Sequence, residues 1–356
     1  MEKYLSTNPF LIMIRSVTVF ILMLACITAT AQQNGFSIVE KKEQRQVDIL
    51  FNNKLLTAYC YYDSGRKPIL FPVNTVDGIM VTRNYPFKTV PGERTDHPHH
   101  TGIWLNYESV NGLDFWNNST AIAPEKRNLY GTILHQKVIS KKTNGNNASL
   151  AIAATWVRLD SKVLLNEETR FNFSVVGNDF IIDRITTLTA TDTTVLFKDA
   201  KDGMFAIRVA RELELPSKEK TSFVDDKGNV TNVAPSGEGV TGMYYGSTGL
   251  KGDSVWSSKG NWMMLAGKKE GKNITIAMFD HPLNVGYPTY WHARGYGLFA
   301  ANPLGKKIFS NGKEEFNFSL APKQSTTVRY RVVIHSGDML TADQMNKWAA
   351  DFGKVK

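Results

Sequence analysis

The sequence predicts an all-β fold, a large antiparallel β-sandwich with a short C-terminal helix, and three observations support this. Apolar and polar residues alternate in many segments, which is typical of strands with one buried face. Clusters of Asn, Asp and Gly, such as residues 143–147 and 177–179, separate these segments at short intervals, as the hairpins of a sandwich require. The one clear helical pattern lies at the end of the chain.

The alternation locates the strands in chain order. Residues 47–51 lead through Asn52-Asn53 into residues 55–59, which indicates a hairpin. Further strands are predicted at residues 171–175, 316–320 and 327–334. Because successive side chains of a strand point to opposite faces, the apolar members of each series are expected to form the core.

A C-terminal helix is predicted to begin after Thr341. Thr341 and Gln344 have the spacing of a capping box, in which each side chain binds the other residue's backbone N–H. Met345, Trp348 and Phe352 follow at intervals of three and four residues and form one apolar face. We expect this face to cover an edge or an end of a sheet.

The N-terminus has the layout of a secretory signal peptide. Lys3 and Arg15 precede an apolar run over residues 17–27, and Ala29-Thr30-Ala31 offers a cleavage site. We therefore predict a signal peptide over residues 1–31, cleaved after Ala31, and an exported protein of the periplasm or cell surface. The weak lipoprotein motif that ends at Cys26 is the alternative.

Residues 35–356 are predicted to form a single β-sandwich domain, because no linker or repeat divides them. Without the signal peptide, Cys60 is the one cysteine, which excludes an intramolecular disulfide. No second apolar stretch approaches the ~20 residues of a membrane span. The net charge of +9 comes from scattered lysines without a nucleic-acid-binding motif, so we expect no nucleic-acid partner.

The most informative segment is Asp96-His97-Pro98-His99-His100, which holds three of the seven histidines. Imidazole carries or releases a proton near neutral pH and also binds metals, so this density indicates a site. In an extended segment, His97 and His99 would face one side and His100 the other. The alternative is a polar loop in which Pro98 fixes a turn.

Residues 279–297 form a second candidate segment, rich in aromatic residues, histidine and arginine. Aromatic rings stack on the C–H faces of sugars, and polar side chains bind hydroxyl groups, so the composition suits a sugar site. The alternative is that Trp291 and its neighbours pack beneath a loop. Because His97 and His281 each precede a proline and an aromatic-rich stretch, we expect both segments to face one cavity.

These two segments supply the predicted site residues. Imidazoles would act as general acid and base, and an arginine would stabilise oxyanion charge. The predicted catalytic residues are His97, His99, His100, His281, His292, Arg94 and Arg294. The predicted substrate-binding residues are Arg83, Asp96, Trp104, Asn106, Glu108, Asn284, Tyr287 and Trp291. Residues 114–116 and 201–208 are weaker candidates, since a lone Asp or Arg there is more often structural.

The chain resembles the DUF6807 family, whose members are often labelled "methane oxygenase PmoA". The resemblance lies in residues 95–104, the Arg208-Val209-Ala210 step and residues 287–303. It implies an exported bacterial protein with a large β-sandwich similar to the galactose-mutarotase-like supersandwich, and it implies no established catalytic residue. The label conflicts with the absence of a second apolar segment, because particulate methane monooxygenase is a membrane protein.

Three functions fit these residues. The first is a carbohydrate-active enzyme (an epimerase, lyase or hydrolase) that uses histidine acid/base chemistry in mutarotation, elimination or hydrolysis of a small sugar or an oligosaccharide. The second is an oxygenase-like enzyme with a divalent metal cofactor, for which His97, His99 and His292 are candidate ligands. The third is a non-catalytic sugar-binding protein.

Overall fold

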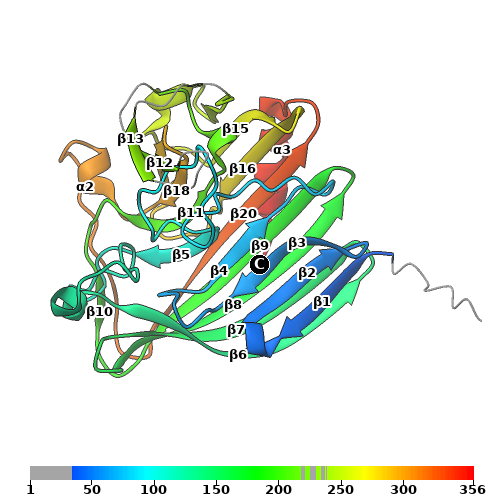
Figure 1. The fold of residues 1–356 in the computed structure, drawn as a ribbon. Helices are drawn as coiled ribbons and strands as arrows, with labels where there is room; N and C mark the ends of the chain where they lie inside the picture. Colours follow the sequence, from blue (N-terminus) through cyan, green and yellow to red (C-terminus); the bar gives the residue numbers. More distant parts are fainter. Residues whose placement is uncertain (1–33, 218–220, 225–229, 234–236, 238) are drawn as a thin grey trace, which may run out of the picture. The chain divides into compact units, whose positions relative to one another are not determined.

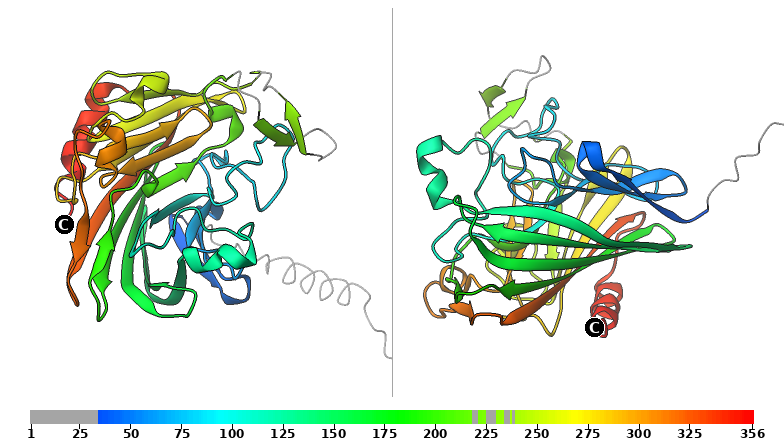
Figure 2. Two further views of the ribbon diagram at one scale, coloured as in Figure 1. Left: turned by 90° about the vertical axis from the view of Figure 1, so that its left-hand side faces the viewer. Right: turned by 90° about the horizontal axis from the view of Figure 1, so that it is seen from below.

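Two eight-stranded antiparallel sheets make up most of the fold (Figures 1 and 2). In spatial order, the first sheet contains β1 (Phe36–Lys41), β2 (Gln46–Phe51), β3 (Lys54–Cys60), β4 (Ile69–Val73), β5 (Ile103–Tyr107), β11 (Gly203–Arg208), β18 (Leu298–Asn302) and β17 (Tyr290–Arg294). The second contains β14 (Met243–Gly246), β15 (Trp262–Lys269), β16 (Lys272–Asp280), β20 (Ser325–Ser336), β9 (Asp179–Ala190), β8 (Val163–Val176), β7 (Asn147–Val157) and β6 (Thr132–Asn144).

The computed structural model describes residues 34–217, 221–224, 230–233, 237 and 239–356. Residues 34–356 form one compact unit, whereas the predicted signal peptide lies outside the described residues. The smaller elements are the strand pairs β10 (Val195–Phe197) with β19 (Phe318–Leu320) and β12 (Thr221–Val224) with β13 (Val230–Val233), the helices α2 (Lys306–Phe309) and α3 (Ala342–Phe352), and the 3-10 turns η1 (Lys42–Gln44), η2 (Pro124–Leu129), η3 (Arg211–Leu213) and η4 (Gly252–Val255).

The main core lies between the facing sides of the two sheets, as the alternation predicts. Val328, Tyr330, Val332 and Ile334 of β20 enter this core, and every second residue of β8 over residues 171–175 does the same. Burial of these apolar side chains is the main favourable term in folding. The all-β sandwich and the hairpin of β2 and β3 are therefore confirmed.

Helix α3 packs on the outer face of the second sheet, where Met345 and Phe352 join Trp262 and Val333 in a separate apolar cluster (Figure 2). The capping box is present, because Thr341 accepts from the Gln344 N–H and Gln344 binds back. The helix is thus confirmed, but it covers the face of β15 and β16, and not an edge or end. In the described part of the chain, no helix has the length and hydropathy of a bilayer-crossing segment.

The outer face of the first sheet carries the polar side chains of interest. In the paired register of β5, β11, β18 and β17, one row reads Trp104, Ala206, Ala300 and His292. The intervening residues of these strands point into the sandwich core. Cross-strand neighbours on one face lie about 5 Å apart, so this row places Trp104 and His292 at the two ends of a floor of small alanines.

Gly102 sets the entry into β5. Its φ is +57°, and a Cβ at this position would lie 2.2 Å from the carbonyl oxygen of Leu70. A glycine is required there because other residues rarely adopt this backbone conformation and none could avoid the clash. The chain can therefore turn sharply from the histidine segment into a strand at the sheet centre.

Candidate functional site

The histidine segment forms a tight turn over the outer face of the first sheet. The His100 N–H donates to the His97 carbonyl over 2.9 Å, and His97 has a left-handed φ of +44°. The His97 and His100 rings stack with centroids 4.7 Å apart, and His99 lies edge-on to both. The expectation of an extended segment is therefore wrong, because the turn brings all three rings together.

Two buried arginines hold this turn in place. Arg83 donates to the Asp96 carboxylate over 2.8 Å and to the backbone carbonyls of Arg94, Asp96, His97 and His100. Arg208, from the end of β11, donates to the same Asp96 oxygen over 2.7 Å. Arg83 was predicted to bind substrate, but it is buried and both of its Nη atoms donate to the loop.

Asp96 and His97 form a carboxylate–imidazole pair. The Nδ1 atom of His97 lies 3.2 Å from Oδ2 of Asp96, and 40% of the His97 side chain is exposed. Burial alone would raise the pKa of Asp96, but the hydrogen bond from His97 and the charges of Arg208 and Arg83 outweigh burial and hold this pKa well below its usual value. Asp96 is therefore a carboxylate at neutral pH. It can fix the tautomer and the orientation of the His97 ring.

Tyr296 and His100 frame the exposed imidazole. The Tyr296 ring stacks on His97 at 5.1 Å between centroids, and Arg208 lies 4.9 Å from the same phenol ring. Both ring nitrogens of His100 face protein donors, with Trp116 Nε1 and Arg208 Nη1 each 3.3 Å away. His100 therefore supports the turn, whereas His97 presents its second nitrogen outward.

His292 and Asp202 make a second pair close to His97. Nδ1 of His292 lies 3.5 Å from Oδ1 of Asp202, which precedes β11. Burial lowers the pKa of His292 to about 3, and the charges of Lys201, Arg294 and His97 add to this effect. Burial raises the pKa of Asp202, while Lys201 and, among weaker influences, His97 lower it. The pair thus combines a neutral imidazole with a carboxyl group that holds its proton more tightly than usual.

Two further carboxyl groups adjoin Asp202. Burial raises the pKa values of Glu108 and Asp114, and the charge of Asp202 adds to the rise for both. Glu108 accepts the backbone N–H of Asp202 over 2.9 Å, and Asp114 accepts from the Asn117 amide over 2.8 Å. Like charges in one partly buried place oppose each other's ionisation, so these carboxyl groups hold their protons more tightly than exposed ones.

Two cavities lie near the histidine turn. A pocket of about 570 Å³ is lined by Arg294, Tyr296 and Trp256, among others. A smaller cavity of about 180 Å³ is lined by His99 and Lys67. Lys67 donates to the His99 carbonyl over 2.7 Å, and burial lowers its pKa to about 7. The smaller cavity therefore borders the turn directly at Pro98 and His99, whereas the larger pocket borders Tyr296, whose ring stacks on His97.

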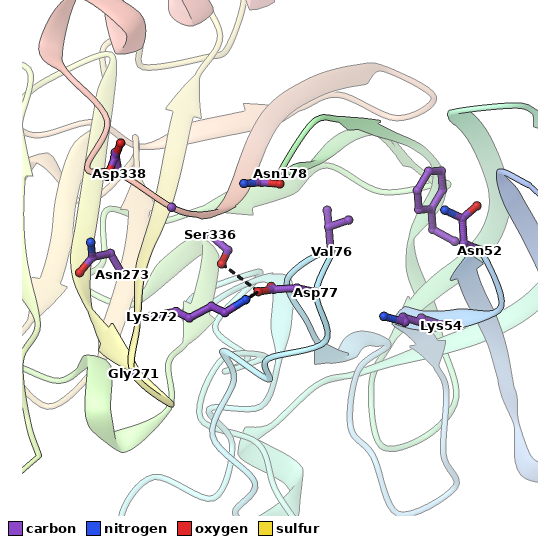
Figure 3. Close-up of a pocket in the computed structure, with 12 residues that line it drawn as sticks. Asn52, Lys54, Val76, Asp77, Asn178, Gly271, Lys272, Asn273, Ser336 and Asp338 are labelled. Atoms are coloured by element: carbon purple, nitrogen blue, oxygen red, sulfur yellow. Dashed lines mark hydrogen bonds and ion pairs between the residues drawn. The ribbon is translucent and has the colours of Figure 1, made fainter.

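A third pocket, of about 640 Å³, lies among other loops and contains none of the histidines (Figure 3). Asp77 on its wall is bound by Lys272, Ser336 and Thr75. Burial would raise the pKa of Asp77, but the hydrogen bonds from Lys272 and Thr75 outweigh burial and lower it. Asp77 is therefore poorly suited to proton donation.

Comparison with known proteins identifies the family of the chain. The model of DUF6807, a family of unknown function, matches residues 46–350. The chain belongs to the DUF6807 family. This match confirms the resemblance carried by the histidine and aromatic motifs. No curated protein matches the sequence.

Several solved structures are similar to the chain at low identity. The family 36 α-galactosidase AgaB from Geobacillus stearothermophilus is 12% identical with a TM-score of 0.41, over 85% of this chain and 41% of that chain. The Slr1438 protein from Synechocystis sp. PCC 6803 is 12% identical with a TM-score of 0.30, over 87% and 99%. A β-arabinopyranosidase is 10% identical with a TM-score of 0.29, over 87% and 40%. The chain thus spans less than half the length of the two glycosidases.

Part of the second predicted segment lies away from the histidine turn. The His281 ring packs edge-on against Phe352 of α3 at 5.0 Å, on the outer face of the second sheet. Asn284 is tied to Asp280 and to the backbone of Arg329. The expectation that His281 and Asn284 face the same cavity as His97 is therefore wrong. Tyr287, in the same loop, is exposed there, and none of the described contacts joins it to the turn.

Three other predicted substrate contacts have structural surroundings. Trp291 is fully buried in the sandwich core against Phe299, because it points opposite to its neighbour His292. Trp104 is covered by the stacked His100 ring, and Asn106 donates to the Phe115 carbonyl over 2.6 Å. These aromatic and amide groups support the site and are not open to a ligand.

Arg94 and Glu108 also differ from their predicted roles. Arg94 is buried and donates to Glu214 over 2.7 Å, and Glu108 binds the backbone of Asp202. Both still border the site, since Arg94 also lines the 570 Å³ pocket. Of the predicted residues, Asp96, His97, His99 and His100 belong to the turn and His292 lies close to His97, while Arg94 and Arg294 line the larger pocket and His99 lines the smaller cavity.

The described residues contain no group of three or more His, Cys, Asp or Glu side chains arranged to hold a metal ion. His97, His99 and His292 therefore do not form a ready ligand set. As metal ligands, both His97 and His292 have one ring nitrogen already engaged. Nδ1 of His97 faces Asp96, and Nδ1 of His292 faces Asp202.

Sequence reasoning left Asp202 among the weaker candidates and gave Tyr296 and Lys67 no role in the site. Asp202 stands in a short turn before an apolar strand, where a lone aspartate is usually structural. The available signal was the Lys201-Asp202-Gly203 turn and its position next to a strand that ends in Arg208. Only the pairing of β11 with β5 and β18 shows that these residues meet the histidine turn.

His281→Asn is expected to leave kcat/KM for any substrate within about twofold of wild type. The ring touches α3 and not the histidine turn, so its loss should reduce stability by about 1 kcal/mol. Steady-state kinetics and urea unfolding of the variant would measure the two effects. A loss of activity of more than tenfold in a folded variant would show that His281 does take part in the site.

The contribution of His292 to stability should fall as the pH falls below about 6.5, while Asp280, whose pKa burial raises to about 7, acts in the opposite direction. His292 has a folded-state pKa of about 3, so between about pH 6.5 and 3 the unfolded chain binds a proton that the folded protein excludes. The contribution of His292 to the free energy of unfolding is fully present above pH 6.5 and is lost through this window. At pH 5 the loss from this group alone is about 2 kcal/mol.

Urea unfolding at pH 7.5 and pH 5.0, for wild type and His292→Gln, would measure this effect. Asp202 acts in the opposite direction, because its pKa is raised. The expected result is therefore a smaller difference between the two pH values in the variant than in wild type. An equal difference would contradict a buried neutral His292.

Proposed function

We propose that the protein is an exported carbohydrate-active enzyme that transfers protons on a sugar, with His97 as one acid/base group and Asp202 as the other. The observation that carries this proposal is the Asp96–His97 pair. A carboxylate fixes one nitrogen of a partly exposed imidazole, and two buried arginines fix the carboxylate. Such support of a proton-transferring group by fixed partners is typical of general acid–base catalysis.

His97 is suited to remove a proton from a sugar carbon or hydroxyl group. Its Nδ1 faces Asp96, and no hydrogen bond within the described residues occupies Nε2. As Nε2 takes a proton, the ring becomes positively charged, and the neighbouring carboxylate stabilises that charge. The stacked Tyr296 ring keeps the imidazole in a fixed plane.

Asp202 is suited to supply a proton on another side of the substrate. Its raised pKa keeps a larger fraction of the carboxyl group protonated near neutral pH than an exposed aspartate would have. Groups whose surroundings shift their proton affinities in this way support assignments of acid and base. The geometry therefore favours mutarotation, epimerisation or elimination over hydrolysis through a carboxylate nucleophile.

The experiment is a panel of reducing sugars, uronic acids and oligosaccharides, followed by proton exchange at sugar carbons in heavy water, by mutarotation rate and by ultraviolet absorbance of unsaturated products. We expect one class to react with wild type and to react at least 100-fold more slowly with Asp202→Asn. Binding without turnover of any class would instead indicate a non-catalytic sugar-binding protein.

Export is part of the proposal and has its own test. The signal-peptide layout of residues 1–31 supports it. Expression of the full chain in a host with a general secretion system should give a mature protein whose N-terminal residue is Gln32. An intact Met1 in the purified protein would contradict export by this route.

A further inference from the structure

We propose that the 570 Å³ pocket beside His97 is a subsite for a sugar that carries a carboxylate, with Arg294 as the group that binds the carboxylate; this proposal rests on the proposed function. It extends that function by naming the substrate class as acidic sugars, such as uronic acids. The argument depends on the position of Arg294, on the two aromatic rings near it and on the other charges of the pocket.

Arg294 is an exposed cation that has no acidic partner among the described residues. It ends β17, two residues beyond His292, so both side chains project from the same outer face of the first sheet. Its guanidinium lies 5.3 Å from the ring of Trp256. Within the residues that the structure describes, no carboxylate lies within ion-pair distance of it. A planar guanidinium held over an indole is pre-arranged to bind a carboxylate through two parallel hydrogen bonds.

Aromatic rings on the pocket wall suit the sugar that would carry this carboxylate. Tyr296 and Trp256 both line the pocket, and Tyr296 also stacks on His97. A sugar ring placed against Tyr296 in this pocket would therefore be separated from the proposed acid/base group by this one aromatic ring. The pocket volume of about 570 Å³ is ample for one or two sugar units.

The remaining charges of the pocket single out Arg294 as the binding group. Arg94 also lines the pocket, but Glu214 lies 2.7 Å from it and balances its charge. Asp253 is the one carboxylate among the described lining residues, and it lies against the backbone of Gly295. Asp253 would repel a ligand carboxylate toward Arg294 and accept hydrogen bonds from sugar hydroxyl groups.

Isothermal titration of the purified protein with galacturonate and glucuronate, and with galactose and glucose, tests the proposal. We expect the uronates to bind at least about tenfold more tightly than the neutral sugars, with a preference that decreases as sodium chloride is added. Arg294→Gln should abolish the preference, and Arg294→Lys should keep part of it. Lys313→Gln, which removes an exposed positive charge elsewhere, should leave the preference unchanged.

Equal binding of uronates and neutral sugars would overturn the assignment of Arg294, while the proposed function would stand. A uronate preference that survives in Arg294→Gln would also overturn it. If no sugar of either class binds or reacts, both the subsite and the proposed function fail together. Retention of the wild-type melting temperature in Arg294→Gln separates loss of the ligand contact from loss of the fold.

Discussion

Replacing His97 with glutamine should lower kcat/KM by about 100- to 10,000-fold while the melting temperature stays close to that of wild type. The side chain is 40% exposed and glutamine has a similar size, so the replacement should change the packing little. Glutamine keeps a polar group near Asp96 but cannot accept and release a proton at neutral pH. The kinetic loss should fall on kcat more than on KM, because the group acts in the transition state. Steady-state kinetics with the sugar found in the panel would measure it.

The chain offers a matched control for this variant. His335 also contacts a carboxylate through Nδ1, that of Asp179 at 2.6 Å, but it lies on β20 of the second sheet. His335→Gln should therefore leave kcat/KM unchanged. A similar activity loss in both variants would indicate a general effect on folding. Full activity of folded His97→Gln would remove the Asp96–His97 pair from the mechanism.

Replacing Arg208 with methionine should destabilise the fold by about 3–5 kcal/mol, since buried charges would lose their partner. Arg208 is fully buried, binds Asp96 over 2.7 Å and lies 3.9 Å from Glu214. Methionine fills similar volume without a charge. Two carboxylates would remain in a poorly hydrated place with one cation fewer. Urea unfolding at pH 7.5 would measure the loss.

The control for Arg208→Met is an exposed ion pair of the same type. Arg45 and Asp63 are paired at 2.7 Å on the surface, and exposed pairs typically contribute less than about 1 kcal/mol. Arg45→Met should therefore have a small effect. If Arg208→Met were equally mild, the turn would be held mainly by Arg83, and the proposed rigidity of Asp96 would depend on that residue alone.

The sandwich was predictable because a strand with one buried face alternates apolar and polar residues along the sequence. Tyr330 and its alternate neighbours in β20 point to one core, and the sequence shows this directly. Thr341 and Gln344 likewise mark the start of α3 through local chemistry. These features depend on residues close in sequence, which is why they can be inferred without coordinates.

The site was only partly predictable, because long-range contacts decide it. The His97 turn is shaped by Arg83, in the loop after β4, and by Arg208 of β11, so local sequence left the choice between an extended segment and a turn open. The His-Pro steps at 97 and 281 look alike, but their strands belong to different sheets. Trp291 and His292 are adjacent and therefore face opposite sides, and only one of them can belong to the outer face.

The central claim is that a sugar binds between His97 and Asp202. The most direct test is a crystal structure of the inactive Asp202→Asn variant with the reactive sugar. The account predicts a sugar oxygen or carbon next to Nε2 of His97, with the sugar ring against Tyr296. A sugar bound instead in the pocket around Asp77 and Lys272, with none near the histidine turn, would contradict the account.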